Sequence, residues 1–107
     1  MLGNRILEMD IVRLMEPGKA NARNLAEILR REGLETEMCV DPPGTKYGRH
    51  KHEFDELVVI VSGMMKLYTE RQTWIMKPGD RLNIPAFTLH WSEVVGKEEV
   101  RYLSAAK

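Results

Sequence analysis

Cysteine is nearly absent from this sequence of 107 residues: Cys39 is the single one, so the chain cannot form an internal disulfide. Disulfides persist in oxidising compartments and are rare in the cytosol. The N-terminal segment has no apolar stretch of the length that a secretory signal contains. We therefore expect a cytoplasmic protein in which Cys39 is a small hydrophobic residue on a strand, the alternative being a reactive nucleophile.

Long apolar runs and an excess of either charge are also missing. The longest unbroken apolar run covers residues 57–61, whereas a helix needs roughly 20 apolar residues to span a bilayer. The 16 Lys and Arg residues balance the 16 Asp and Glu residues, and the balance holds within residues 1–53 and within residues 54–107. Binding to nucleic acid through its phosphates requires a basic excess. The sequence therefore predicts no membrane association and no nucleic-acid partner.

Glycine and proline divide the chain into short segments. Turn signals at residues 17–18, 42–44 and 78–79 are examples, and they bound segments whose spacing is typical of an all-β sandwich or barrel. Alternation of apolar and polar residues predicts strands within these segments. The expected strands cover residues 35–41, 56–62, 64–70, 72–76, 89–95 and 99–104, with weaker ones at 5–10 and 11–15.

One segment has helical periodicity. Apolar residues recur every three or four positions over residues 21–32, which predicts an amphipathic helix whose stripe packs on the domain, the alternative being a partner-binding helix. Asn21 or Asn24 is suited to cap its start, and Gly33 to end it. The length suits one core. We predict a single domain over residues 1–107, with N-terminal strands and the helix in 1–34 and the barrel in 35–104.

The three histidines form a candidate site with one carboxylate. His50 and His52 lie two residues apart, so on an extended segment they project from the same face. Glu56 is an even number of residues from both histidines, so its carboxylate can lie on the same side of the chain. His90 lies on a later strand that can face them across a barrel. Three imidazoles and a carboxylate would form a divalent-metal site with open positions. The alternative is a set of polar side chains satisfied inside a barrel without metal.

These residues resemble the two motifs of the cupin family. The first motif is matched over residues 44–63, where Gly44, His50, His52, Glu56 and Gly63 keep its spacing. The second is matched over residues 79–94 by three residues, Gly79, Pro85 and His90. The segment departs from that motif at two positions, with Phe87 in place of glycine and Val94 in place of asparagine.

The resemblance implies an all-β cupin fold, the double-stranded β-helix or jelly-roll barrel, here with one N-terminal α-helix. It further implies a single divalent metal ion, of manganese, iron, nickel, copper or zinc. The ligands that it implies are His50, His52, Glu56 and His90. It also implies a homodimer, since small cupins commonly pair.

Strand parity predicts what surrounds this site. Val58, Ile60 and Ser62 share the side of Glu56, and Ser92 and Val94 share the side of His90, so the cavity is expected to be mostly apolar. The opposite face of residues 57–61 is apolar as well, which indicates burial under the helix or a second subunit.

Few other polar or aromatic side chains are candidates for the cavity. They are Tyr47, Arg49, Tyr68 and Tyr102 at its mouth and Phe87 and Trp74 at its entrance, and each is more readily an ordinary surface, edge or core residue.

The site leaves several functions open. If the metal takes all three histidines, none remains as a general base, which favours metal-dependent oxidoreductase chemistry of the dioxygenase type on a small organic substrate. The alternatives are a non-catalytic binding or sensor module for a small ligand and a non-redox metal-dependent isomerase or lyase. A purely structural metal would have a closed coordination shell.

Overall fold

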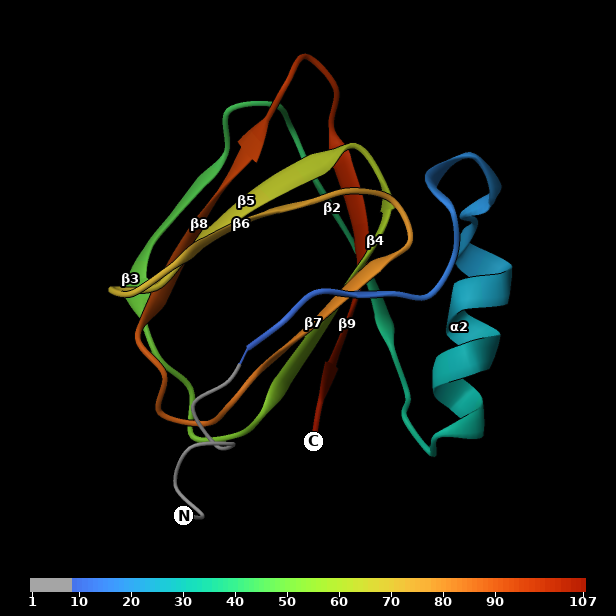
Figure 1. Cartoon of the computed structure of the whole chain (residues 1–107), viewed down its shortest axis with the longest axis horizontal. Helices are drawn as coiled ribbons and strands as arrows, with labels where there is room; N and C mark the ends of the chain where they lie inside the picture. The colour runs from blue at the N-terminus through green and yellow to red at the C-terminus, as the bar shows by residue number, and fades with distance from the viewer. Residues whose placement is uncertain (1–8) are drawn as a thin grey trace.

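The computed structural model describes residues 9–107, and within that range it contains two antiparallel sheets and one α-helix (Figure 1). The predicted strand at 5–10 lies largely outside the described residues. No helix in the described range is long and apolar enough to cross a membrane. In chain order the elements are β1 (Val12–Arg13), the 3-10 helix η1 (Pro17–Lys19), α2 (Ala22–Arg31), β2 (Glu37–Asp41), β3 (Lys46–His50), β4 (Glu56–Ser62), β5 (Met64–Tyr68), β6 (Thr73–Met76), β7 (Asp80–Ile84), β8 (His90–Val95) and β9 (Val100–Ala106).

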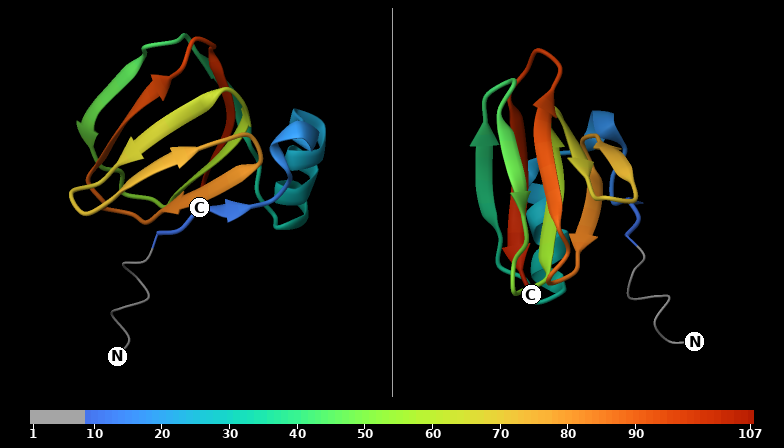
Figure 2. Two further views of the ribbon diagram at one scale, coloured as in Figure 1. Left: turned by 45° about the horizontal axis from the view of Figure 1, so that its top comes forward. Right: turned by 90° about the vertical axis from the view of Figure 1, so that its left-hand side faces the viewer.

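The two sheets face each other as a jelly roll. One has the order β1-β7-β4-β9-β2 and the other the order β3-β8-β5-β6. Figure 2 shows the helix lying beside this pair of sheets, where it packs on the outer face of the first sheet. The predicted all-β jelly-roll fold with one N-terminal helix is confirmed. Strands β2 and β3 are edge strands, one in each sheet.

Strand β4 separates two apolar clusters. Val58 and Ile60 point between the sheets and pack in the inner cluster. Leu57 and Val59 point outward and are fully buried beneath helix α2. Burial of side chains of this size stabilises a fold by roughly 1.5–3 kcal/mol each. The predicted alternation is therefore confirmed. The sequence analysis expected the outer face to be buried under the helix or a second subunit, and it is the helix that buries Leu57 and Val59.

Helix α2 begins and ends with the groups that the sequence offered. The Asn21 side chain accepts a hydrogen bond from the Asn24 backbone N–H at 2.9 Å, so Asn21 is the N-cap. Beyond the last turn, Gly33 takes a φ of +84°, and its N–H donates to the Arg30 carbonyl. A left-handed glycine ends helices in this way because it carries no Cβ.

Two strands of the structure, β3 and β7, were not predicted from the sequence pattern. Strand β3 has no buried residue and only His50 half-buried, because it is an edge strand and its side chains do not alternate in polarity. Strand β7 begins with a buried aspartate, Asp80, whose Oδ2 accepts from the Lys77 N–H at 2.9 Å. A carboxylate at an inward position hides the alternation that Leu82 and Ile84 would otherwise show.

Gly79 lies at a close backbone crossing. Its φ is +91°, and a Cβ at this position would lie 2.0 Å from the Met15 carbonyl oxygen. Because that oxygen belongs to the backbone, Gly79→Ala should lower the free energy of unfolding by about 2–4 kcal/mol, measured by urea denaturation. Gly18→Ala is the control, since nothing lies within 4 Å of a Cβ built there. Equal midpoints for the two variants would contradict the prediction.

Candidate metal centre

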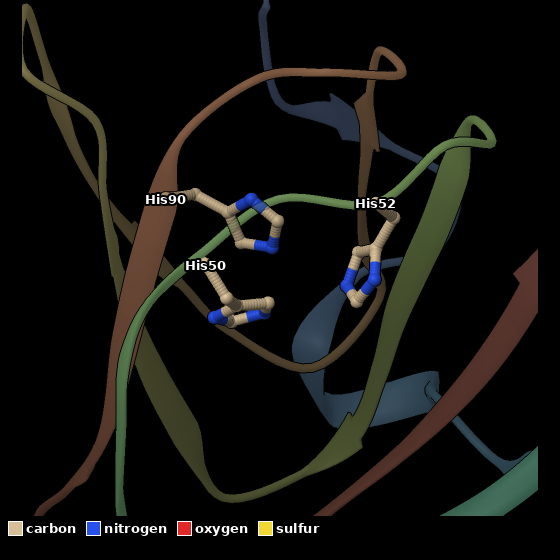
Figure 3. A group of neighbouring side chains, drawn as sticks. All are labelled: His50, His52 and His90. Carbon is tan, nitrogen blue, oxygen red and sulfur yellow. The ribbon is translucent and has the colours of Figure 1, made fainter.

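The side chains of the three histidines point toward one another (Figure 3). His50 ends β3 and pairs with His90, the first residue of β8, while His52 lies in the loop that follows β3. One ring nitrogen of each lies within 4.8 Å of the others. The ring centroids of His50 and His90 are 4.2 Å apart. The sequence analysis expected His90 to face His50 and His52 from across the barrel, and this expectation is wrong for His50. Strand β8 lies beside β3 in the same sheet, and their pairing sets His90 next to His50.

Backbone carbonyls fix the orientation of two of the rings. The Nδ1 atom of His50 lies 2.6 Å from the Gly48 oxygen, and the Nδ1 atom of His90 lies 2.8 Å from the Thr88 oxygen. Each Nδ1–H donates to a carbonyl, so the lone pair of the neutral ring is on Nε2. Metal-ligating histidines are commonly oriented by such a bond.

Glu56 adds a carboxylate to the cluster. Its Oε1 lies 3.4 Å from His52 Nε2 and 3.6 Å from His90 Nε2. Burial alone would raise the pKa of Glu56, but its interactions with His90 and with the other nearby imidazoles outweigh burial and lower that pKa. Burial alone would lower the pKa of His90, but Glu56 and the Thr88 carbonyl raise it. Glu56 is therefore anionic at neutral pH and attracts positive charge to the cluster, whether a proton or a metal cation.

The donor set fits a divalent metal. Unprotonated imidazole nitrogens that converge in a half-buried site repel one another through their lone pairs, and His90 is only 3% exposed. A cation between them removes this repulsion. Neutral imidazoles with one carboxylate suit zinc, iron, nickel, manganese and copper. The residues could therefore hold such an ion, and a cavity of about 260 Å³ leaves room for a ligand beside it.

Strand parity predicted only part of the cavity wall, since Ile60 and Val94 pack in the inner cluster and do not line the cavity. The apolar part includes Val58, and Ser92 contributes a hydroxyl. Val94 is buried in the inner cluster, on the same side. Two of the tyrosines considered from sequence, Tyr47 and Tyr102, also line the cavity.

The other residues considered from sequence lie elsewhere. Arg49 and Tyr68 are on the outer face of the second sheet, where both pack against Trp91, with the Arg49 Cζ atom 4.1 Å from that ring. Trp74 is 7% exposed and belongs to the inner cluster. Cys39 is half-buried on β2, and burial, with Glu37 nearby, raises the pKa of its thiol, which disfavours the reactive thiolate.

Asp41 is the functional candidate that sequence reasoning missed. It accepts hydrogen bonds from the Tyr47 hydroxyl at 2.9 Å and from the Tyr102 hydroxyl at 3.0 Å. The only signal in the sequence was its position two residues after Cys39, which places the two side chains on the same side of β2. Nothing in that pattern indicated two tyrosines from two different sheets.

Phe87 keeps the backbone conformation of the glycine that it replaces in the second motif. Its φ is +63°, and its N–H donates to the His52 carbonyl at 2.7 Å. The loop next to the histidines therefore closes despite the substitution. A left-handed backbone costs a residue with a Cβ roughly 1–2 kcal/mol.

This strain predicts an unusual order of stability. Phe87 is 66% exposed, so truncation removes little packing. Phe87→Gly should be more stable than Phe87→Ala by about 1 kcal/mol, measured by thermal and urea unfolding. At Phe54, whose φ is not positive, the same pair of variants should show the opposite order. An alanine variant as stable as the glycine variant at position 87 would remove the strain argument.

Solved structures of low identity share the fold. A cupin-2 domain containing protein from Shewanella frigidimarina has a TM-score of 0.59 at 18% identity, covering 67% of this chain and 68% of its own. KdgF from a Halomonas species has a TM-score of 0.60 at 17% identity, covering 92% and 76%. A chain from the crystal structures of the DMSP lyases RdDddP and RnDddQII has a TM-score of 0.63 at 24% identity, covering 69% of this chain and 38% of its own. Identities of this size establish the fold alone.

Comparison of the sequence with known protein families agrees with the shared fold. A search among curated proteins finds no match. The family model described as Cupin domain matches residues 37–106, which is more than half of the chain. That range contains both motifs, the three clustered histidines and Glu56. The chain therefore belongs to the cupin family.

Proposed function

We propose that this protein is a metal-dependent oxidoreductase of the dioxygenase type that acts on a small organic molecule. The observation that carries the proposal is the convergence of three imidazoles and a carboxylate beside a cavity. The proposed ligands of one divalent transition metal are His50, His52, Glu56 and His90.

Each residue of the site has a defined part in this proposal. The carbonyls of Gly48 and Thr88 orient two imidazoles so that their Nε2 atoms present lone pairs. Glu56 contributes one negative charge, which leaves a divalent ion with a net charge of about +1 toward a substrate. The apolar walls limit water around the reacting groups. A metal bound there supplies Lewis acidity and, if it is redox-active, electron transfer.

The remaining cavity residues favour chemistry that depends on the metal alone. All three histidines are committed to the proposed site, so none is free to move a proton. Burial, followed by the hydrogen bond to Asp41, raises the pKa of Tyr102 far above its usual value. A hydroxyl that holds its proton so tightly is a poor general base at neutral pH. Epimerisation and similar proton-shuttling reactions are therefore disfavoured.

The same metal site and cavity would also serve two alternatives. One is a non-redox metal-dependent lyase or isomerase. A binding or sensor module for a small ligand uses the same cavity without turnover. One fold hosts many chemistries, so the metal and the reaction must be measured.

Elemental analysis of protein purified without a chelator or a His-tag is the first test, followed by oxygen-electrode assays with enediol, catechol and thiol compounds. Stoichiometric iron, manganese, copper or nickel with substrate-dependent oxygen uptake supports the proposal. Stoichiometric zinc without oxygen uptake favours the lyase, isomerase or binding alternatives. Protein that binds none of these metals, even after reconstitution, would refute the metal site.

The homodimer and the cytoplasmic location stay predictions. Helix α2 buries the outer face of β4, which removes one reason for expecting a partner there. Met38 and Val40 are exposed on the edge strand β2 and would suit an interface. Light scattering after size exclusion gives the mass in solution directly.

A further inference from the structure

Two tyrosines and an aspartate join the two sheets at the open edge of the barrel. Asp41 ends β2, an edge strand of the first sheet, and Tyr47 lies on β3, an edge strand of the second. Tyr102 lies on β9, beside β2. Each oxygen of the Asp41 carboxylate accepts from one tyrosine hydroxyl, at 2.9 and 3.0 Å. Both hydroxyl protons therefore point at Asp41.

This arrangement fixes the hydrogen-bonding character of the cavity wall. Tyr47 and Tyr102 both line the cavity that the histidines line. A phenol whose proton is donated elsewhere keeps its oxygen lone pairs as acceptors. At this wall a ligand therefore meets hydrogen-bond acceptors backed by a carboxylate charge.

Cationic side chains are missing from the described lining of the cavity, which contains neither lysine nor arginine. Arg49, the arginine nearest in sequence to the histidines, stacks on Trp91 on the outer face. A phosphate or a second carboxylate on the ligand would find no positive partner at the tyrosine wall. An ammonium or hydroxyl group would find acceptors there.

We propose that Tyr47 and Tyr102, held by Asp41 as a positioning residue, bind a hydrogen-bond-donating group of the substrate. The substrate would then be a small bifunctional molecule with a single anionic, metal-binding end and an ammonium or hydroxyl end, of the kind found in amino acids and hydroxy acids. This assignment rests on the proposed metal site, which takes the anionic end.

Isosteric probes test the proposal by binding, without turnover. The probes are 3-aminopropanoate, 3-hydroxypropanoate and butanoate, which have the same number of heavy atoms and differ only in the terminal group. Calorimetry on the metal-loaded protein should show that at least one of the two donor probes binds about tenfold more tightly than butanoate, the gain of roughly one net hydrogen bond. Tyr102→Phe should abolish that preference and leave metal content unchanged.

Asp41→Asn gives a sharper test because it redirects one proton. The amide oxygen accepts from one tyrosine, but the amide N–H donates to the other, whose proton is then free to point into the cavity. The variant should lose the preference for donors and gain affinity for butanedioate, whose second carboxylate accepts. Tyr47→Phe, at a residue that is 43% exposed, is the substitute if Tyr102→Phe fails to fold.

The possible failures are distinguishable. Metal-loaded wild-type protein that binds all three probes equally, or none of them, overturns the donor assignment and leaves the metal site standing. Variants that lose thermal stability but keep the wild-type preference show that the three residues only join the sheets, which also overturns it. Protein that takes up no metal refutes the proposed function, and this assignment falls with it.

Discussion

His90→Ala should abolish the stabilisation that metal gives to this protein. His90 is the first residue of β8, while the other proposed imidazole ligands come from β3 and the loop after it, so a metal ties separate segments together. A ligand present at 100 times its dissociation constant stabilises the native state by about 2.7 kcal/mol. For a domain of this size, that corresponds to a shift in Tm on the order of 10–20 °C. The wild type should show this shift on metal addition and the variant should not.

Controls separate loss of the ligand from general damage. His90 is buried and bonded to the Thr88 carbonyl, so its removal also destabilises the metal-free protein. Unfolding is therefore measured for both proteins with and without chelator, and the two differences are compared. Ser92→Ala, on the same strand and facing the same cavity, should keep the metal. Unchanged metal stoichiometry in His90→Ala would refute the ligand assignment.

Glu56→Gln should weaken metal retention without changing the shape of the site. The amide keeps one oxygen in place but removes the negative charge beside His52 and His90. We expect at least the roughly 10-fold loss of affinity that follows removal of a partner group around a metal site. Competition with a chromogenic chelator measures it.

The matched control for Glu56 is a neighbouring carboxylate. The control variant is Glu37→Gln. Glu37 lies on β2 and lines an adjacent cavity that Glu56 also borders, and it makes no contact with the histidines. That variant should bind metal as the wild type does. Full retention by Glu56→Gln together with altered turnover would instead make Glu56 a catalytic acid or base.

Local rules were sufficient for much of the fold. The bounds of β4 agree with the predicted strand at 56–62, and α2 agrees within one residue at each end of the predicted range 21–32. Both elements have an apolar period that matches their secondary structure, and both end at residues with a clear conformational reason, such as Gly33 and Gly63, which take positive φ values. The strands with weak patterns, β3 and β7, were the ones missed.

The candidate metal centre was also largely readable from the sequence. Because side chains alternate along an extended segment, His50 and His52, two residues apart, lie on one face of it in any tertiary context. His90 is 38 residues beyond His52 in the chain, and only the resemblance of two motifs joined the two segments. The registry of β3 with β8, which sets His50 opposite His90, is a tertiary fact. It depends on which strands become neighbours, and spacing along the chain does not encode that.

The sequence by itself determined the all-β class, because period and turn chemistry are properties of neighbouring residues. Through the resemblance of two motifs it also indicated the family and the four residues proposed as ligands. Only the tertiary structure decided that helix α2 covers Leu57 and Val59, and that Phe87 adopts a glycine-like backbone. It alone also brought Asp41 between Tyr47 and Tyr102. These contacts join segments far apart in the chain or from different sheets, and such contacts are fixed by packing of the whole domain rather than by local preference.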